Sequence, residues 1–129
     1  MRRVIIIQHR TDYTLSSSMT TSTTNNTITI PATGTYEVTY SGSYELNATG
    51  LNLVYFQLFE NGSDFGNNGE LRSRINTTST SSNEIESFHR SFIAEFTASD
   101  VLELYYQRFA GSATEIDFFN LNFSVKRLK

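Results

Sequence analysis

The chain contains no cysteine and no tryptophan, and it has only one proline and two histidines in 129 residues. Without cysteine it can form neither a disulfide framework nor a thiolate metal site. His9 and His89 lie far apart in the sequence, so no clustered histidine pair predicts a metal centre. Serine nucleophile elbows and glycine-rich phosphate loops are also missing. We therefore predict no catalytic residue, no metal and no cofactor, and we expect that the protein is not an enzyme.

Charge and hydropathy argue against two classes of partner. The net charge is -3, whereas nucleic-acid binding needs a basic face. No apolar run approaches the length of a transmembrane helix. An apolar run at residues 4–7 follows Arg2 and Arg3, as in a signal peptide, but it is far too short and polar residues follow it. We expect neither nucleic-acid binding nor membrane insertion, and we interpret residues 4–8 as a first strand.

The residues that are abundant favour β-structure. The chain has 10 Phe and 7 Tyr, it is rich in Thr, and it lacks the Ala-, Leu- and Lys-rich blocks that are typical of helices. The best helical candidate, residues 99–108, also alternates as a strand does, and its two adjacent Tyr favour the strand. The length of the whole chain, 129 residues, predicts a single domain. Within it we expect a strand or docking arm at residues 1–15, followed by the main domain at residues 16–129. Strands are predicted at residues 4–8, 27–30, 34–46, 51–60, 70–76, 86–96, 101–109 and 115–126.

Turn residues separate the predicted strands. Pro31 cannot donate to a β-ladder, and Gly34 permits a reversal of the chain, so both mark the end of one strand and the start of the next. Asn61 followed by Gly62 is a strong signal for a tight turn. Residues 16–26 are rich in Ser, Thr and Asn, which predicts a loop or a polar edge segment. Short strands at this spacing predict an all-β sandwich or jelly roll.

Alternation within two strands predicts which side chains enter the core. In the strand at residues 101–109, the core side is predicted to hold Leu102, Leu104 and Tyr106. In the last strand, it is predicted to hold Phe119, Leu121, Phe123 and Val125. The opposite faces of these strands are also apolar, and they carry Val101, Tyr105, Phe109, Ile116 and Phe118. A small sandwich whose strands are apolar on both faces needs a second cover, which an intersubunit contact would provide.

Four sequence blocks, taken in order, resemble the jelly roll of tumour necrosis factor-like ligands and of complement-type globular heads. They read ITIPATGTYEVTYSGSY, LVYFQLFENGS, SFHRSFIAEFTASDVLELYY and IDFFNLNFSVKRL. The family usually has Gly before the Asp of the turn in the third block, where this chain has Ser99 before Asp100. The resemblance implies an antiparallel two-sheet jelly-roll sandwich that assembles as a homotrimer. The five outward residues Val101, Tyr105, Phe109, Ile116 and Phe118 are then the predicted trimer interface.

A trimeric jelly roll without a stalk or a recognisable export signal is typical of a virion component. We expect a non-enzymatic structural protein on the virion surface, most simply a decoration protein on a phage capsid. The residues predicted to dock onto the capsid or another virion protein are Arg2, Arg3, Val4, Ile5, Ile6 and Ile7. The alternative is a receptor- or carbohydrate-binding tip of a tail or fibre, with host-surface glycans stacking on Tyr44 and Phe65 and bonding to Asn67. A secreted cytokine-like ligand is a more distant alternative.

Two weaker chemical alternatives concern carboxylates. The pairs Glu84 with Glu86 and Glu95 with Glu103 are conceivable as glycosidase acids, but solvated strand positions explain them more simply. The oxygen-rich loop at residues 60–70 is conceivable as a Ca²⁺ site around Asp64. It has few carboxylates, so an ordinary glycine-rich loop is the better prediction.

Overall fold

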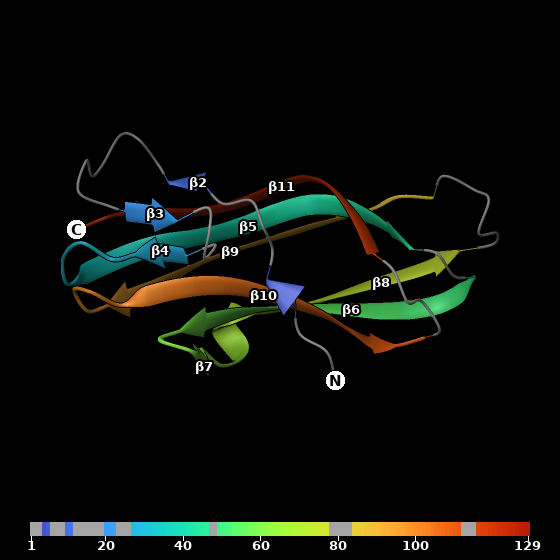
Figure 1. Ribbon diagram of the computed structural model, residues 1–129, viewed down its shortest axis with the longest axis horizontal. Helices are drawn as coiled ribbons and strands as arrows, with labels where there is room; N and C mark the ends of the chain where they lie inside the picture. The colour runs from blue at the N-terminus through green and yellow to red at the C-terminus, as the bar shows by residue number, and fades with distance from the viewer. Residues whose placement is uncertain are drawn as a thin grey trace.

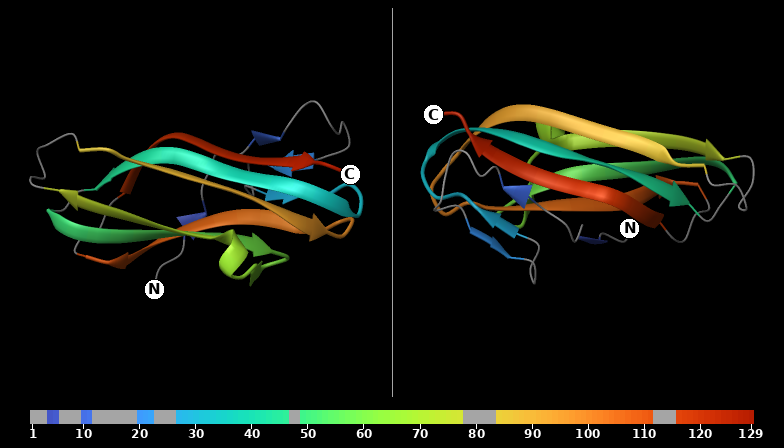
Figure 2. Two further views of the ribbon diagram at one scale, coloured as in Figure 1. Left: turned by 180° about the vertical axis from the view of Figure 1, so that it is seen from behind. Right: turned by 90° about the horizontal axis from the view of Figure 1, so that it is seen from above.

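The protein is an all-β sandwich of two facing sheets, seen in a computed structural model (Figures 1 and 2). The structure describes residues 4–5, 10–11, 20–22, 27–46, 49–77, 84–111 and 116–129. The strands of this part of the chain are β1 (Val4–Ile5), β2 (Arg10–Thr11), β3 (Thr20–Ser22), β4 (Thr27–Thr29), β5 (Gly34–Leu46), β6 (Gly50–Glu60), β7 (Ser63–Asp64), β8 (Glu70–Thr77), β9 (Glu86–Phe96), β10 (Val101–Ala110) and β11 (Ile116–Arg127). A 3-10 turn, η1 (Asn67–Gly69), precedes β8.

Each sheet combines strands that are distant in sequence. One sheet has the order β3-β4-β10-β6-β7, with β1 paired to β10 and β8 paired to β6; the other has the order β2-β11-β5-β9. Among the described residues, all pairings are antiparallel except that of β2 with β11. The predicted antiparallel jelly-roll sandwich is therefore confirmed. No helix in the described ranges is long and apolar enough to span a membrane.

Most strand bounds follow the hydrophobic alternation of the sequence. The strands β5 and β9 begin and end at the predicted residues, and β6, β8, β10 and β11 lie within one residue of the prediction at each end. The helical alternative for residues 99–108 is wrong, because β10 pairs with β4 on one side and β6 on the other. The polar stretch at residues 16–26 contains β3, which pairs with β4 as an edge strand.

The core lies between the sheets and combines aromatic rings with aliphatic side chains. β5 contributes Tyr36, Val38, Tyr40 and Tyr44, all 0% exposed, and β6 contributes Val54, Phe56 and Leu58, also 0% exposed. The rings of Phe56 and Phe88 stack with centroids 3.9 Å apart, which joins β6 of one sheet to β9 of the other. Leu102 and Leu104 are buried and Tyr106 packs against the core, so the predicted inner face of β10 is confirmed.

A β-bulge in β11 changes which of its side chains face inward. In the β11–β5 pairing, Phe119 lies opposite Ser43 while Asn122 lies opposite Ser41, so one extra residue is present in β11. An extra residue shifts the alternation by one position and exchanges the two faces of the strand. Phe123 and Val125 after the bulge are buried and Leu121 packs against the core, as predicted.

Before the bulge, the predicted faces of β11 are wrong. Phe119, predicted to be in the core, is 38% exposed. Ile116 and Phe118, predicted to face outward as part of the trimer interface, pack against the core of their own chain. The Phe118 ring meets Tyr106 at a centroid distance of 4.6 Å and Phe56 at 6.0 Å.

Two turns depend on positive φ angles. Asn61 and Gly62 have φ of 50° and 82°, the left-handed pair that a two-residue hairpin turn between β6 and β7 requires. The predicted Asn-Gly turn is therefore confirmed. Between β9 and β10, Ser99 has φ of 75°, a conformation that glycine adopts without steric cost and other residues adopt at a cost.

Candidate binding surfaces

The outward side chains of β6, β8 and β10 form one continuous face, called here the outer face. Pairing places β6 between the other two strands. The outer face consists of Leu51, Leu53, Tyr55, Gln57 and Phe59 from β6, Glu70, Arg72, Arg74 and Asn76 from β8, and Val101, Glu103 and Tyr105 from β10. It combines apolar, aromatic and charged side chains, whereas the opposite side of the same strands is in the core.

Aromatic rings occupy the β6–β10 half of the outer face. The rings of Phe59 and Tyr105 approach with centroids 4.3 Å apart, and the Tyr105 hydroxyl donates to Glu103 Oε2 at 3.2 Å. The outward orientation predicted for Val101 and Tyr105 is consistent with the alternation of β10, whose inner face carries Leu102 and Leu104. The side chain of Phe109 lies outside the described residues.

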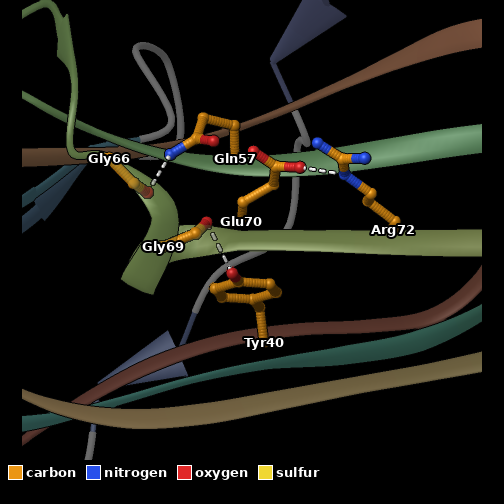
Figure 3. Close-up of polar contacts among 6 residues, drawn as sticks. All are labelled: Tyr40, Gln57, Gly66, Gly69, Glu70 and Arg72. Atoms are coloured by element: carbon orange, nitrogen blue, oxygen red, sulfur yellow. Dashed lines mark hydrogen bonds and ion pairs between the residues drawn. The ribbon is translucent and has the colours of Figure 1, made fainter.

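An ordered arginine occupies the β6–β8 half of the outer face. The Arg72 guanidinium lies over the Tyr55 ring, 4.8 Å from its centroid, and forms an ion pair with Glu70 (Figure 3). The hydrogen bond and the charge of Glu70 raise the pKa of Arg72 above its usual value. These contacts favour a position of the guanidinium over the Tyr55 ring, although the Arg72 side chain is 67% exposed.

The connection between β7 and β8 is held by three side chains from the sheets. The Gln57 amide donates to Gly66 O at 3.1 Å, the Tyr40 hydroxyl to Gly69 O at 2.6 Å, and the Arg90 Nη2 to Asn68 O at 2.9 Å. Figure 3 shows the first two of these contacts, made from opposite sheets of the sandwich. Burial raises the pKa of Tyr40 well above its usual value, although the nearby Arg90 charge acts in the opposite direction. The loop is therefore fixed by its backbone carbonyls.

The residues predicted to bind a glycan lie in three different environments. Tyr44 is 0% exposed, in β5, and its hydroxyl lies 2.7 Å from the Ser73 hydroxyl, so its predicted place in a solvent loop is wrong. Burial raises the pKa of Tyr44, although the hydrogen bond with Ser73 lowers it. Phe65 packs against the core, with its ring centroid 5.4 Å from that of Phe96. Asn67 is exposed, and it alone of the three is open to a ligand.

The predicted docking segment is only partly within the described residues. Val4 and Ile5 form β1, which pairs with Tyr106 and Tyr105 of β10. The backbone of Val4 and Ile5 is therefore paired within the sandwich, as a strand of the sheet that contains β10. Arg2, Arg3, Ile6 and Ile7 lie outside the described part of the chain.

A carboxyl pair that the sequence did not reveal joins two turns at one end of the sandwich. Asp100 accepts from the Asn61 amide at 2.9 Å and from Thr97 N at 2.8 Å. Burial alone would raise the pKa of Asp100, but these hydrogen bonds outweigh it and lower the pKa. Burial, together with the hydrogen bond and charge of Asp100, raises the pKa of Glu60. The sequence predicts turns at Asn61 and Asp100, but only their pairing in space brings Glu60 beside Asp100.

The pair Glu95 with Glu103 and the Ca²⁺ alternative around Asp64 gain no support from the geometry. Glu95 is on β9 and Glu103 on β10, in different sheets, and both point away from the core. Asp64 Oδ1 accepts from Gly66 N at 2.6 Å, which is an ordinary turn contact. No three His, Asp or Glu side chains within the described ranges are close enough to hold a metal ion.

Neither the family models nor the curated proteins give a match to this chain.

Proposed function

We propose that this protein is a structural component of a virion, a trimeric decoration protein on the surface of a phage capsid. The observation that carries the proposal is the outer face. Strands β6 and β10 bury one face in the core, yet Leu53, Tyr55 and Tyr105 lie on the other. Such a face favours contact with another protein, because interfaces are enriched in aromatic residues and Arg relative to the rest of the surface.

The fold and the resemblance give further support. Jelly-roll sandwiches are common in viral capsid and lectin domains, although a fold by itself does not define a function. The four blocks that resemble the trimeric jelly rolls all lie in strands of the sandwich and their turns. Among the predicted trimer-interface residues whose side chains the structure describes, Val101 and Tyr105 are on an outward face, whereas Ile116 and Phe118 pack inward.

The test is co-sedimentation with capsids of the parent virus that lack this protein. We expect the wild-type chain to pellet with the capsids in a saturable manner. A variant carrying Arg2→Glu and Arg3→Glu is preferred to a truncation, because deleting residues 1–15 would also remove β1 and β2 from their sheets. The charge variant should bind more weakly if this segment docks. Absence of wild-type binding at micromolar concentrations would contradict the capsid assignment.

A second candidate, a receptor- or glycan-binding tip, is favoured by the fixed loop between β7 and β8. Its carbonyls are held by Gln57, Tyr40 and Arg90, and it presents Asn67 to solvent. A fixed loop loses little conformational entropy on binding. Binding to a glycan array that Asn67→Ala removes and Asn76→Ala preserves would support this candidate. An array with no signal for the wild-type chain would argue against it.

A further inference from the structure

Charge on the outer face is ordered along the edge formed by β8 and β7. Pairing with β6 places Arg74 beside Leu53, Arg72 beside Tyr55, Glu70 beside Gln57 and Asp64 beside Phe59. These four positions follow one another along β6 at every second residue, roughly 7 Å apart. The edge therefore carries two positive charges followed by two negative charges.

This order is complementary to itself when the second copy runs antiparallel to the first. A two-fold axis in the plane of the outer face, crossing the strands between Arg72 and Glu70, places a second copy over the first with its strands reversed. Arg72 then lies opposite Glu70 of the second copy, and Arg74 lies opposite Asp64. A copy in the same orientation would instead place like charges together, which is unfavourable. The same surface on both copies is the defining property of a two-fold interface.

The apolar residues match under the same operation. Leu53 and Phe59 lie two residues to either side of the Tyr55–Gln57 pair at the centre, so the axis brings Leu53 of one copy over the position of Phe59, which is itself only 7% exposed. Tyrosine and arginine, both frequent at the energetic centre of interfaces, lie next to the axis as Tyr55 and Arg72. The contacts of the Arg72 guanidinium with Tyr55 and Glu70 already favour one position, so that less order has to be gained on association.

We propose that the outer face pairs with the outer face of a second copy of this chain about this two-fold axis. The pairing does not rest on the proposed capsid function. It uses the same face as the proposed trimer contact at Val101 and Tyr105, so the two contacts are alternative uses of that face. Three strands at their usual spacing, over the length of β6 from Leu51 to Phe59, form a face of roughly 400 Å² per copy. Interfaces of this size are weak, so the pairing is reversible and depends on concentration.

The experiment is sedimentation equilibrium of the full chain over a range of concentrations. An average mass that grows toward twice 14.6 kDa with concentration would support the pairing. A mass that stays at one or three times 14.6 kDa up to millimolar concentration would overturn it. The same data test the trimer separately, because only multiples of three support the three-fold assembly and only even multiples support the two-fold pairing.

Charge reversal tests the predicted partners. Arg74→Glu and Asp64→Arg should each weaken pairing at least tenfold, because each places like charges together twice across the axis. An equimolar mixture of the two variants should restore pairing, since Glu at position 74 of one then meets Arg at position 64 of the other. Glu95→Arg, on the other sheet, changes the charge as Asp64→Arg does and should leave pairing unchanged. Two folded single variants whose mixture fails to pair would overturn the proposed orientation.

Discussion

Adjacent phenylalanines in β11 give the sharpest test of the fold. Without the bulge, strict alternation would bury Phe119 and leave Phe118 outside, the reverse of the structure. Phe118 contacts Tyr106, Phe56 and two further rings of the core, whereas Phe119 is 38% exposed. Both residues are the same type in the same strand, so Phe118→Ala and Phe119→Ala change the strand propensity by a similar amount.

The structure sets the expected magnitudes. Replacing a core Phe by Ala costs about 3–5 kcal/mol; Phe118 is only partly buried, so we expect about 2–3 kcal/mol for Phe118→Ala. Phe119→Ala creates no core cavity and should cost about 1 kcal/mol or less. Loss of the Phe118 ring also removes edge-to-face contacts, each of which contributes about 0.5–1.5 kcal/mol beyond its buried area.

Urea unfolding followed by far-ultraviolet circular dichroism is the suitable assay, because the chain has no tryptophan to report by fluorescence. The comparison should be made at one low protein concentration, since self-association would raise the apparent stability. A free energy of unfolding lowered as much by Phe119→Ala as by Phe118→Ala would refute the bulge and the inward face of Phe118.

Three further substitutions test local features of the fold. Tyr40→Phe should lower the free energy of unfolding by about 1–3 kcal/mol in urea, because it leaves the buried Gly69 carbonyl without its donor. Ser99→Gly should raise stability by about 0.5–1 kcal/mol, seen as a higher Tm, because Gly relieves the positive φ. Because the pKa of Glu60 is raised, its contribution to stability is largest in acid and is lost as the pH rises through that pKa. The pKa of Asp100 is lowered, so its contribution is lost as the pH falls. Glu60→Gln should therefore stabilise the protein more at about pH 7 than at about pH 4, measured by thermal unfolding.

Strand positions were largely predictable, because alternation and turn residues are local signals. The bounds of β5 and β9 follow from period-two patterns that end at turn residues. The bulge was not predictable, because residues 116–123 carry apolar side chains in both phases of the alternation. When both faces are apolar, a slip of one residue leaves no trace in the pattern. Tyr44 had a usable signal, since it shares the even-numbered phase of Tyr36 and Tyr40 in the same strand.

The candidate surfaces were less predictable than the strands, because they depend on pairing. The alternation of Glu70, Arg72 and Arg74 indicates one charged face of β8 from the sequence alone. Asp64 lies in the same row as these three charged residues, but only the pairing of β7 with β6 reveals this. The Glu60 and Asp100 pair likewise requires two turns, 40 residues apart at Asn61 and Val101, to meet. Long-range register is information that a local pattern does not contain.

The two sheets present outer surfaces of different chemistry, which bears on how the protein would act on a virion. On the four-stranded sheet, Thr39 lies beside Ser91 and Ser124 in one row of paired strands, and the Thr39 and Ser91 hydroxyls lie 3.1 Å apart. Small hydroxyl side chains that bond to one another bury little apolar area on contact, but the same surface also carries Ile93, which is 60% exposed, and Phe119, which is 38% exposed. On the proposed function, the outer face would join copies of the protein, and this second surface, with its row of hydroxyls and its exposed Ile93 and Phe119, would remain for the capsid.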